Sequence, residues 1–223
     1  MQATHQRSIN WRTLLLEAFF IVLGVVLALG ANDWREQRSN VRHAATALES
    51  IRDELETNRQ AVDNALAYHA HLSDTLRIYL RPASQRDGAT PAPQPNMGIF
   101  RKGFISPAIT FSTAWQAAHA TGAISYMAYD DVLLLSRIYE SQRQYYDQHK
   151  LVGQNIYTTL FNEGYAGMLR NIENLQFIIV TFMYQECQLL EHYNEVLPQL
   201  PTDEPTVEYP PVPTTCAFIL GRR

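Results

Sequence analysis

The sequence predicts an all-α membrane protein in which one N-terminal transmembrane helix continues into a long amphipathic helix of an irregular antiparallel helical bundle. Three observations predict this fold: an apolar run near the N-terminus, a heptad repeat after it, and the spacing of helix-breaking residues. With 223 residues, the chain has room for one medium-sized domain and an anchor. The predicted parts are a short tail at 1–12, a transmembrane helix at 13–32, a helical bundle at 33–200 and an extended proline-rich tail at 201–223.

The predicted transmembrane helix lies between Trp11 and Trp34. No polar side chain occurs from 18 to 31, and only Glu17 interrupts the apolar residues before that stretch. About 20 apolar residues span the hydrocarbon core of a bilayer, so membrane lipid is expected around residues 13–32. At about 1.5 Å rise per residue, the two indoles should lie about 34 Å apart, one near each interface.

A cleaved signal peptide is the competing interpretation, with cleavage at 28–30. It fits less well because the helical pattern continues beyond Gly30 without a break, and because Glu17 is unusual in a signal peptide's hydrophobic region. The chain is therefore expected to be a single-pass protein of a bacterial inner membrane. Arginines flank the span on both sides, so the positive-inside rule gives only a weak preference for a domain on the periplasmic side.

Four residues of the span have a further interpretation. Glu17 and Asn32 lie near its opposite ends, and Glu17 either stays hydrated at the interface or pairs with the membrane helix of a partner. Gly24 and Ala28 form a small-xxx-small step, which lets a second helix approach closely and slightly favours self-association.

Beyond the span, a heptad repeat predicts one long helix with a buried stripe. No glycine or proline occurs between Ala31 and Arg81. Asn58 and His69 are the polar members of the stripe: Asn58 is a candidate for fixing register or oligomeric state, and His69 is either tolerated there or pH-sensitive. The two heptad positions hold Trp34, Val41, Leu48, Leu55, Val62, His69, Leu76 and Ala44, Ile51, Asn58, Ala65, Leu72, Tyr79.

Helix breakers divide the rest of the chain. Residues 82–98 are rich in proline and predict an exposed loop. Ser112-Thr113 is expected to cap a short helix that ends near Gly122. A longer helix should start at Asp130-Asp131 and turn at the glycines 164 and 167, and a last helix should cover 168–197.

Composition and motifs exclude several function classes. The net charge of −4 gives no basic face for nucleic acid. We find no nucleophile elbow, phosphate loop or metal-ligand spacing among the seven histidines, so we expect no enzyme activity, cofactor or metal. Cys187 and Cys216 could form one disulfide in an oxidising compartment, but the sequence favours Cys187 as an unpaired core residue.

An aromatic cluster is the remaining candidate site. Aromatic residues with polar tips suit a ligand pocket or a protein interface, and equally the ends of a helical bundle. The candidate surface comprises Trp115, Tyr126, Tyr129 and Tyr139, with Tyr145, Tyr146 and Tyr157 nearby.

Two stretches resemble an uncharacterised family of bacterial single-pass membrane proteins. The first runs from Trp11-Arg12 through Val22-Leu23-Gly24 to Asn32-Asp33-Trp34-Arg35-Glu36. The second runs from Thr113-Ala114-Trp115 to Gly122 and on to 130–139. The resemblance implies a membrane helix followed by a helical domain, and it implies no activity.

Together these observations favour a non-enzymatic membrane-anchored protein that acts through self-association or through another membrane protein. The alternative is a helical domain that senses a small molecule with the tyrosine and tryptophan cluster.

Overall fold

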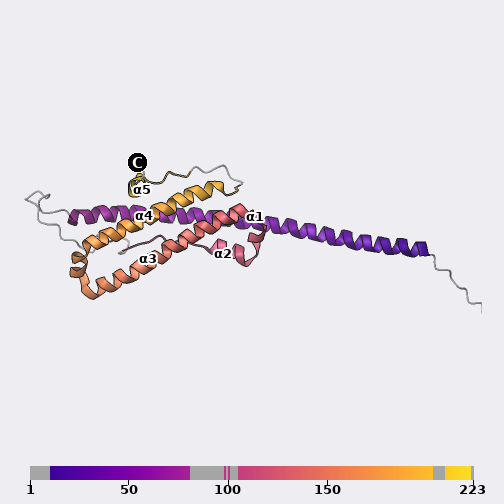
Figure 1. Cartoon of the computed structure of the whole chain (residues 1–223), viewed down its shortest axis with the longest axis horizontal. Coiled ribbons are helices and arrows are strands. Elements are labelled where there is room, and N and C mark those ends of the chain that lie inside the picture. The colour runs from indigo at the N-terminus through magenta and orange to yellow at the C-terminus, as the bar shows by residue number, and fades with distance from the viewer. Residues whose placement is uncertain (1–10, 81–97, 99, 101–104, 203–208, 222–223) are drawn as a thin grey trace, which may run out of the picture.

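The computed structural model describes residues 11–80, 98, 100, 105–202 and 209–221, and every regular element in them is a helix, which confirms the predicted all-α class. The predicted loop at 82–98 lies almost entirely outside the described residues, as do residues 1–10 of the N-terminal tail. The elements are α1 (Trp11–Leu80), α2 (Thr113–Ala120), the 3-10 helix η3 (Ala123–Tyr126), α3 (Tyr129–Arg170), α4 (Ile172–Val196), the 3-10 helix η4 (Leu197–Gln199) and α5 (Thr214–Ile219). Figure 1 labels the α-helices.

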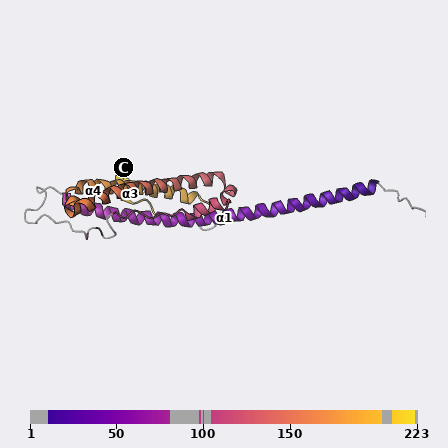
Figure 2. The same cartoon turned by 90° about the horizontal axis from the view of Figure 1, so that it is seen from below.

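Helix α1 is unbroken over 70 residues, which corresponds to about 105 Å. Its first part, residues 11–38, is called the bare part of α1 because no other helix that the structure describes packs on it. It projects alone from the end of the bundle in both views (Figures 1 and 2). The described side chains from Trp11 to Arg38 are all exposed, and this part of the helix has a mean hydropathy of 2.6 in its most apolar window. A helix this long and apolar could cross a membrane.

The bundle begins where α1 first becomes buried, at Ala44. Helix α4 lies alongside α1 and runs antiparallel to it, and α3 packs on α4 (Figures 1 and 2). Helix α2 and η3 contact α1 close to the end from which the bare segment projects. Helix α4 is therefore the middle helix, and its buried residues line the core on two sides: Leu175, Ile179, Phe182, Met183, Glu186, Cys187, Leu189, Leu190, Tyr193 and Val196.

Within the bundle, the heptad stripe is buried inside a single chain. From Ala44 to Leu76 its apolar members are almost inaccessible, whereas Trp34 and Val41, which precede the bundle, are exposed, and Tyr79 at the far end is half-buried. The stripe is therefore covered by the chain's own helices α2, α3 and α4 rather than left free for a second copy. The buried stripe residues are Ala44, Leu48, Ile51, Leu55, Asn58, Val62, Ala65, His69, Leu72 and Leu76.

The short tryptophan-bearing helix ends where the glycine predicts. Helix α2 covers Thr113–Ala120, and Gly122 follows it with φ of +74°, a left-handed conformation that glycine adopts without steric cost. The predicted cap is wrong in detail, because the Ser112 side chain makes no cap hydrogen bond. Instead, the Ala114 N–H donates to the Glu54 carboxylate of α1 at 2.9 Å, so a tertiary contact satisfies the helix start.

The turn predicted at the glycines 164 and 167 is not there, because α3 continues to Arg170. A glycine inside a helix costs only about 1 kcal/mol relative to alanine, and neighbouring helical residues outweigh that cost. The chain reverses instead at Asn171, whose amide N–H donates to the Gly167 carbonyl.

The C-terminal tail is less extended than expected. Residues 209–213 have no regular structure, but α5 follows and contacts α4. Tyr209 and Val212 pack against the core, and Cys216 is buried. The sequence shows the prolines of this segment but not the bundle surface that holds it.

A disulfide joins Cys187 of α4 to Cys216 of α5. The favoured expectation of an unpaired Cys187 is therefore wrong. Cys187 is a core residue, as its apolar neighbours predict, but the packing of α5 brings the second cysteine beside it. Both cysteines are buried.

Candidate functional site

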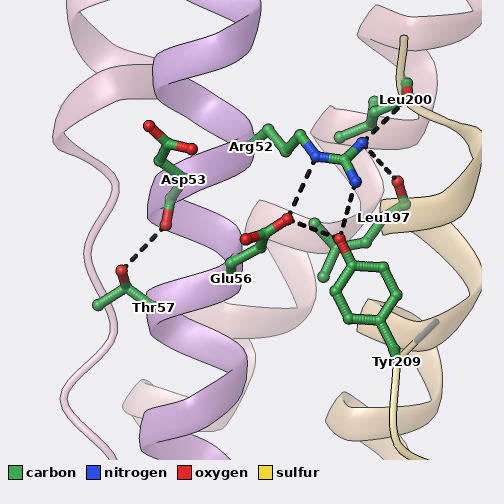
Figure 3. A network of polar contacts seen from close by, with 7 residues as sticks. All are labelled: Arg52, Asp53, Glu56, Thr57, Leu197, Leu200 and Tyr209. Atoms are coloured by element: carbon green, nitrogen blue, oxygen red, sulfur yellow. Dashed lines mark hydrogen bonds and ion pairs between the residues drawn. The ribbon is translucent and has the colours of Figure 1, made fainter. Parts of the chain in front are cut away.

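Arg52 of α1 anchors the segment that follows α4. Its guanidinium group donates to the Leu197 and Leu200 carbonyls at 3.2 Å each and to the Tyr209 hydroxyl at 2.9 Å (Figure 3). It also bonds to Glu56, which accepts a 2.6 Å hydrogen bond from Tyr209. A cation at the C-terminal end of a helix interacts favourably with the helix dipole. Burial of Tyr209, together with its hydrogen bond to Glu56, raises the pKa of Tyr209 to about 12.

Arg59, two helical turns further along α1, binds the other side of the same segment. Its Nε donates to the Asn194 side-chain oxygen at 2.7 Å, and its Nη2 donates to the Pro210 carbonyl at 2.9 Å. The guanidinium also lies over the Tyr209 ring, 5.7 Å from its centre. Arg52 and Arg59 are each less than 10% exposed, so they are structural anchors for the tail.

Asn58 has an intramolecular role. Its side-chain oxygen accepts from the Phe111 N–H at 2.8 Å, and its nitrogen donates to the Phe111 carbonyl at 2.7 Å and to Gln142 at 3.2 Å. These bonds hold the extended chain before α2 between α1 and α3. The asparagine therefore satisfies the backbone of its own chain, and it does not face a second copy.

His69 is paired in the core. Its Nδ1 lies 2.8 and 3.0 Å from the two oxygens of Glu186, which also accepts from the Tyr145 hydroxyl at 3.1 Å. Tyr145 in turn accepts from the Ala108 N–H. Burial raises the pKa of Glu186 above its ordinary value, and the bonds to His69 and Tyr145 oppose this rise only in part.

A second core histidine lies next to this pair. The His149 ring stacks on Phe182, with ring centres 3.8 Å apart, and its Nδ1 bonds to the Tyr145 carbonyl. Burial lowers the pKa of His149 to about 4. The Nε2 atoms of both histidines are buried without a hydrogen-bond partner. Because the cluster is enclosed by the helices, we interpret it as part of the core and not as a place where substrate reacts.

An elongated groove of about 550 Å³ lies between the start of α2 and α3, and residues of the aromatic cluster line it. Trp115 stacks on Tyr139 with ring centres 5.2 Å apart, and the Tyr139 hydroxyl donates to Glu54 at 2.7 Å. Amide, hydroxyl and charged side chains surround the two rings. The lining residues are Thr110, Phe111, Ser112, Trp115, Gln116, Ser136, Tyr139, Glu140, Gln142, Arg143 and Tyr146.

The predicted aromatic cluster is divided by the fold. Trp115 and Tyr139 come together in the groove, whereas Tyr126 and Tyr129 lie at the end of the bundle next to the bare part of α1. Tyr145 belongs to the core, and the side chain of Tyr157 lies outside the described residues. Helical spacing alone could not predict this division, because the division depends on which face of α3 meets α4.

The predicted membrane residues all lie on the bare part of α1. Glu17, Asn32, Trp11 and Trp34 are exposed along it, and nothing lies within 4 Å of a Cβ atom added at Gly24. Ala28 is exposed one turn further on. The Arg38 guanidinium lies over the Trp34 ring, 5.6 Å from its centre.

In the described part of the chain, no group of three or more histidine, cysteine or acidic residues is arranged to hold a metal ion. Comparisons with protein-family models, curated proteins and solved structures found no match. The resemblance to a family of bacterial single-pass membrane proteins therefore stays a prediction.

Sequence reasoning missed Arg52, Arg59, Glu54 and Glu186. Arg52, Glu54 and Arg59 adjoin the heptad stripe of α1, and Glu186 lies among the apolar residues of α4; this position is the one available signal. Apart from the Arg52–Glu56 pair, their hydrogen-bond partners lie more than 40 residues away along the chain, so no local pattern identifies them.

Proposed function

We propose that the chain is a non-enzymatic single-pass membrane protein whose helical domain binds a partner protein through the groove beside Trp115. The observation that carries this proposal is the groove itself, which is open, elongated and lined by aromatic rings and amide groups. Its α3 side runs from Ser136 to Tyr146, about 15 Å along the helix axis. Aromatic side chains next to polar groups are typical of protein interfaces.

The heptad stripe is covered and is therefore not the surface that binds a partner. Coiled-coil self-association would need that stripe free, but the chain's own helices bury it. Self-association through the membrane helix is the second candidate, favoured by the exposed Gly24 and Ala28 on the bare part of α1. A small-molecule ligand is less well supported, because the groove is open along its length rather than enclosed.

We further propose that the domain lies on the periplasmic side of a bacterial inner membrane. The support is the disulfide between Cys187 and Cys216, because such bonds persist in oxidising compartments and are rare in the cytosol. The N-terminal tail would then be cytoplasmic, as the arginines before the span weakly favour. Fusion of a periplasm-active and a cytoplasm-active reporter after Arg223 tests this orientation; activity of the cytoplasmic reporter alone would overturn it.

Site-specific photocrosslinking in intact cells tests the partner. A crosslinking side chain replaces Ser136 or Gln116 in the groove, and a matched control replaces the exposed Glu173 of α4, outside the groove. We expect one defined adduct from the groove positions, and we expect Tyr146→Ala at the exposed groove rim to abolish it. Equal adducts at Glu173, or adducts that are insensitive to Tyr146→Ala, would contradict the groove as the binding surface.

Electrophoresis of the same crosslinked samples tests self-association through the membrane helix. An adduct of twice the chain's own mass that disappears with Gly24→Leu, but not with Tyr146→Ala, would move the interaction from the groove to the membrane helix.

A further inference from the structure

The end of the bundle that faces the bare part of α1 has a defined distance from the proposed membrane span. This end is formed by η3 and by the first residue of α3, Tyr129. The Asn40 side chain of α1 donates to the Tyr126 hydroxyl at 2.9 Å and so fixes η3 to the helix. Asn40 follows Trp34 by six residues, about 9 Å along the axis. Because α1 is continuous here, no hinge can change this distance.

Aromatic side chains are exposed at this end. The Tyr129 side chain is 78% exposed and that of Tyr126 is 47% exposed, although both lie at a folded junction. Ile124, two residues before Tyr126, and Met127, between the two tyrosines, are half-buried. Tyrosine is enriched at membrane interfaces, because its ring enters the acyl-chain boundary while its hydroxyl stays with the headgroups.

The charges at this end do not oppose contact with a lipid surface. Arg35, Arg38 and Arg42 lie on α1 between the span and the bundle, with Asp33 before them and Glu36 among them. Asp130 and Asp131 lie in the first turn of α3, where acidic groups interact favourably with the helix dipole. Both signs are therefore present, which suits zwitterionic headgroups and does not select for anionic lipid.

We infer that this end of the bundle, with Tyr126 and Tyr129 at its tip, rests in the headgroup layer of the membrane that α1 crosses. The inference rests on the proposed membrane anchoring. Headgroups extend about 5–8 Å beyond the hydrocarbon core on each side, and membrane helices tilt by about 20° on average. A tilt towards η3 lowers the tip onto that layer. The contact sets the angle between the bundle and the membrane.

Fluorescence quenching in the full-length protein tests the contact. Because the structure pairs both native cysteines, one added cysteine carries the only reactive thiol. Tyr129→Cys places a dye at the tip, and the matched control Leu151→Cys places it on the same helix, about 33 Å further along the axis. Both positions are exposed. The protein is reconstituted in phosphatidylcholine nanodiscs that contain a lipid with a nitroxide on its headgroup.

We expect several-fold stronger quenching at 129 than at 151, and the same ratio when anionic lipid is added. Equally weak quenching at both positions would overturn the inference. A third dye at Leu23→Cys, with lipids brominated near the chain ends, reports separately on the span. Quenching at Leu23 without quenching at 129 would refute the headgroup contact while the anchor stands; absence of quenching at Leu23 would refute both.

Discussion

Removal of the disulfide should lower the stability of the bundle by a calculable amount. The bond closes a loop across a sequence separation of 29 residues, and the loop-entropy relation then gives about 3.6 kcal/mol at 25 °C. For a domain of this size, each kcal/mol shifts Tm by about 2–4 °C, so Cys187→Ala with Cys216→Ala should lower Tm by roughly 10 °C.

The assay is thermal unfolding of the full-length protein in nanodiscs, followed by far-ultraviolet circular dichroism. Each single variant should lose about as much as the double variant, because either substitution removes the same bond. The parent protein in reductant should approach the double variant, since reduction makes the same covalent change without altering the core volume. The reasoning is refuted if the double variant unfolds within about 2 °C of the parent, or if alkylation finds free thiols in the native protein.

Three further outcomes follow from the buried polar contacts. Arg52→Met should lower the free energy of unfolding in urea by about 3 kcal/mol, because it leaves buried carbonyl groups without a donor; an unchanged midpoint would contradict the anchoring role. The lowered pKa of His149 contributes stability above pH 6.5 that is lost as pH falls towards 4, by about 3 kcal/mol, so urea titrations of parent and His149→Phe should differ by that amount between pH 7 and 4, and parallel curves would argue against it. Asn58→Leu should destabilise the chain by about 2 kcal/mol with unchanged mass in light scattering, because it frees the Phe111 backbone; a more stable or larger assembly would restore a coiled-coil role.

The sequence predicts α1 well, because its signals are local. Residues 31–80 contain no glycine or proline, and the heptad stripe marks the face that becomes buried. The short helix α2 ends beside Gly122, since only that residue takes the left-handed conformation there without strain. In each case a property of one residue type, at one spacing, determines the local structure.

Features that depend on pairing between distant segments could not be predicted. The Cys187–Cys216 bond requires α5 to settle on α4, and the position of α5 depends on Arg52 and Arg59 holding the chain after α4. The partners of Asn58 and His69 likewise come from α3, α4 and the chain before α2. A polar residue in a stripe indicates that a partner exists, but not whether that partner belongs to the same chain.

The candidate site was predicted in composition but not in arrangement. Trp115 and Tyr139 share the groove, yet Tyr126 and Tyr129, close to them in sequence, lie at the end of the bundle. The division follows from the direction of α3, which begins at that end and runs away from it past the groove.

The unbroken α1 also couples the angular position of the groove to the proposed membrane span. A residue inserted between Arg35 and Arg38 would turn the whole bundle by about 100° around the helix axis and raise it by about 1.5 Å. Single, double and triple alanine insertions at this point would therefore present the groove to successive directions around the span and raise it by about 4.5 Å at most. A partner held in the same membrane would bind some of these insertion variants and not the others, whereas a partner free in solution would bind all of them equally.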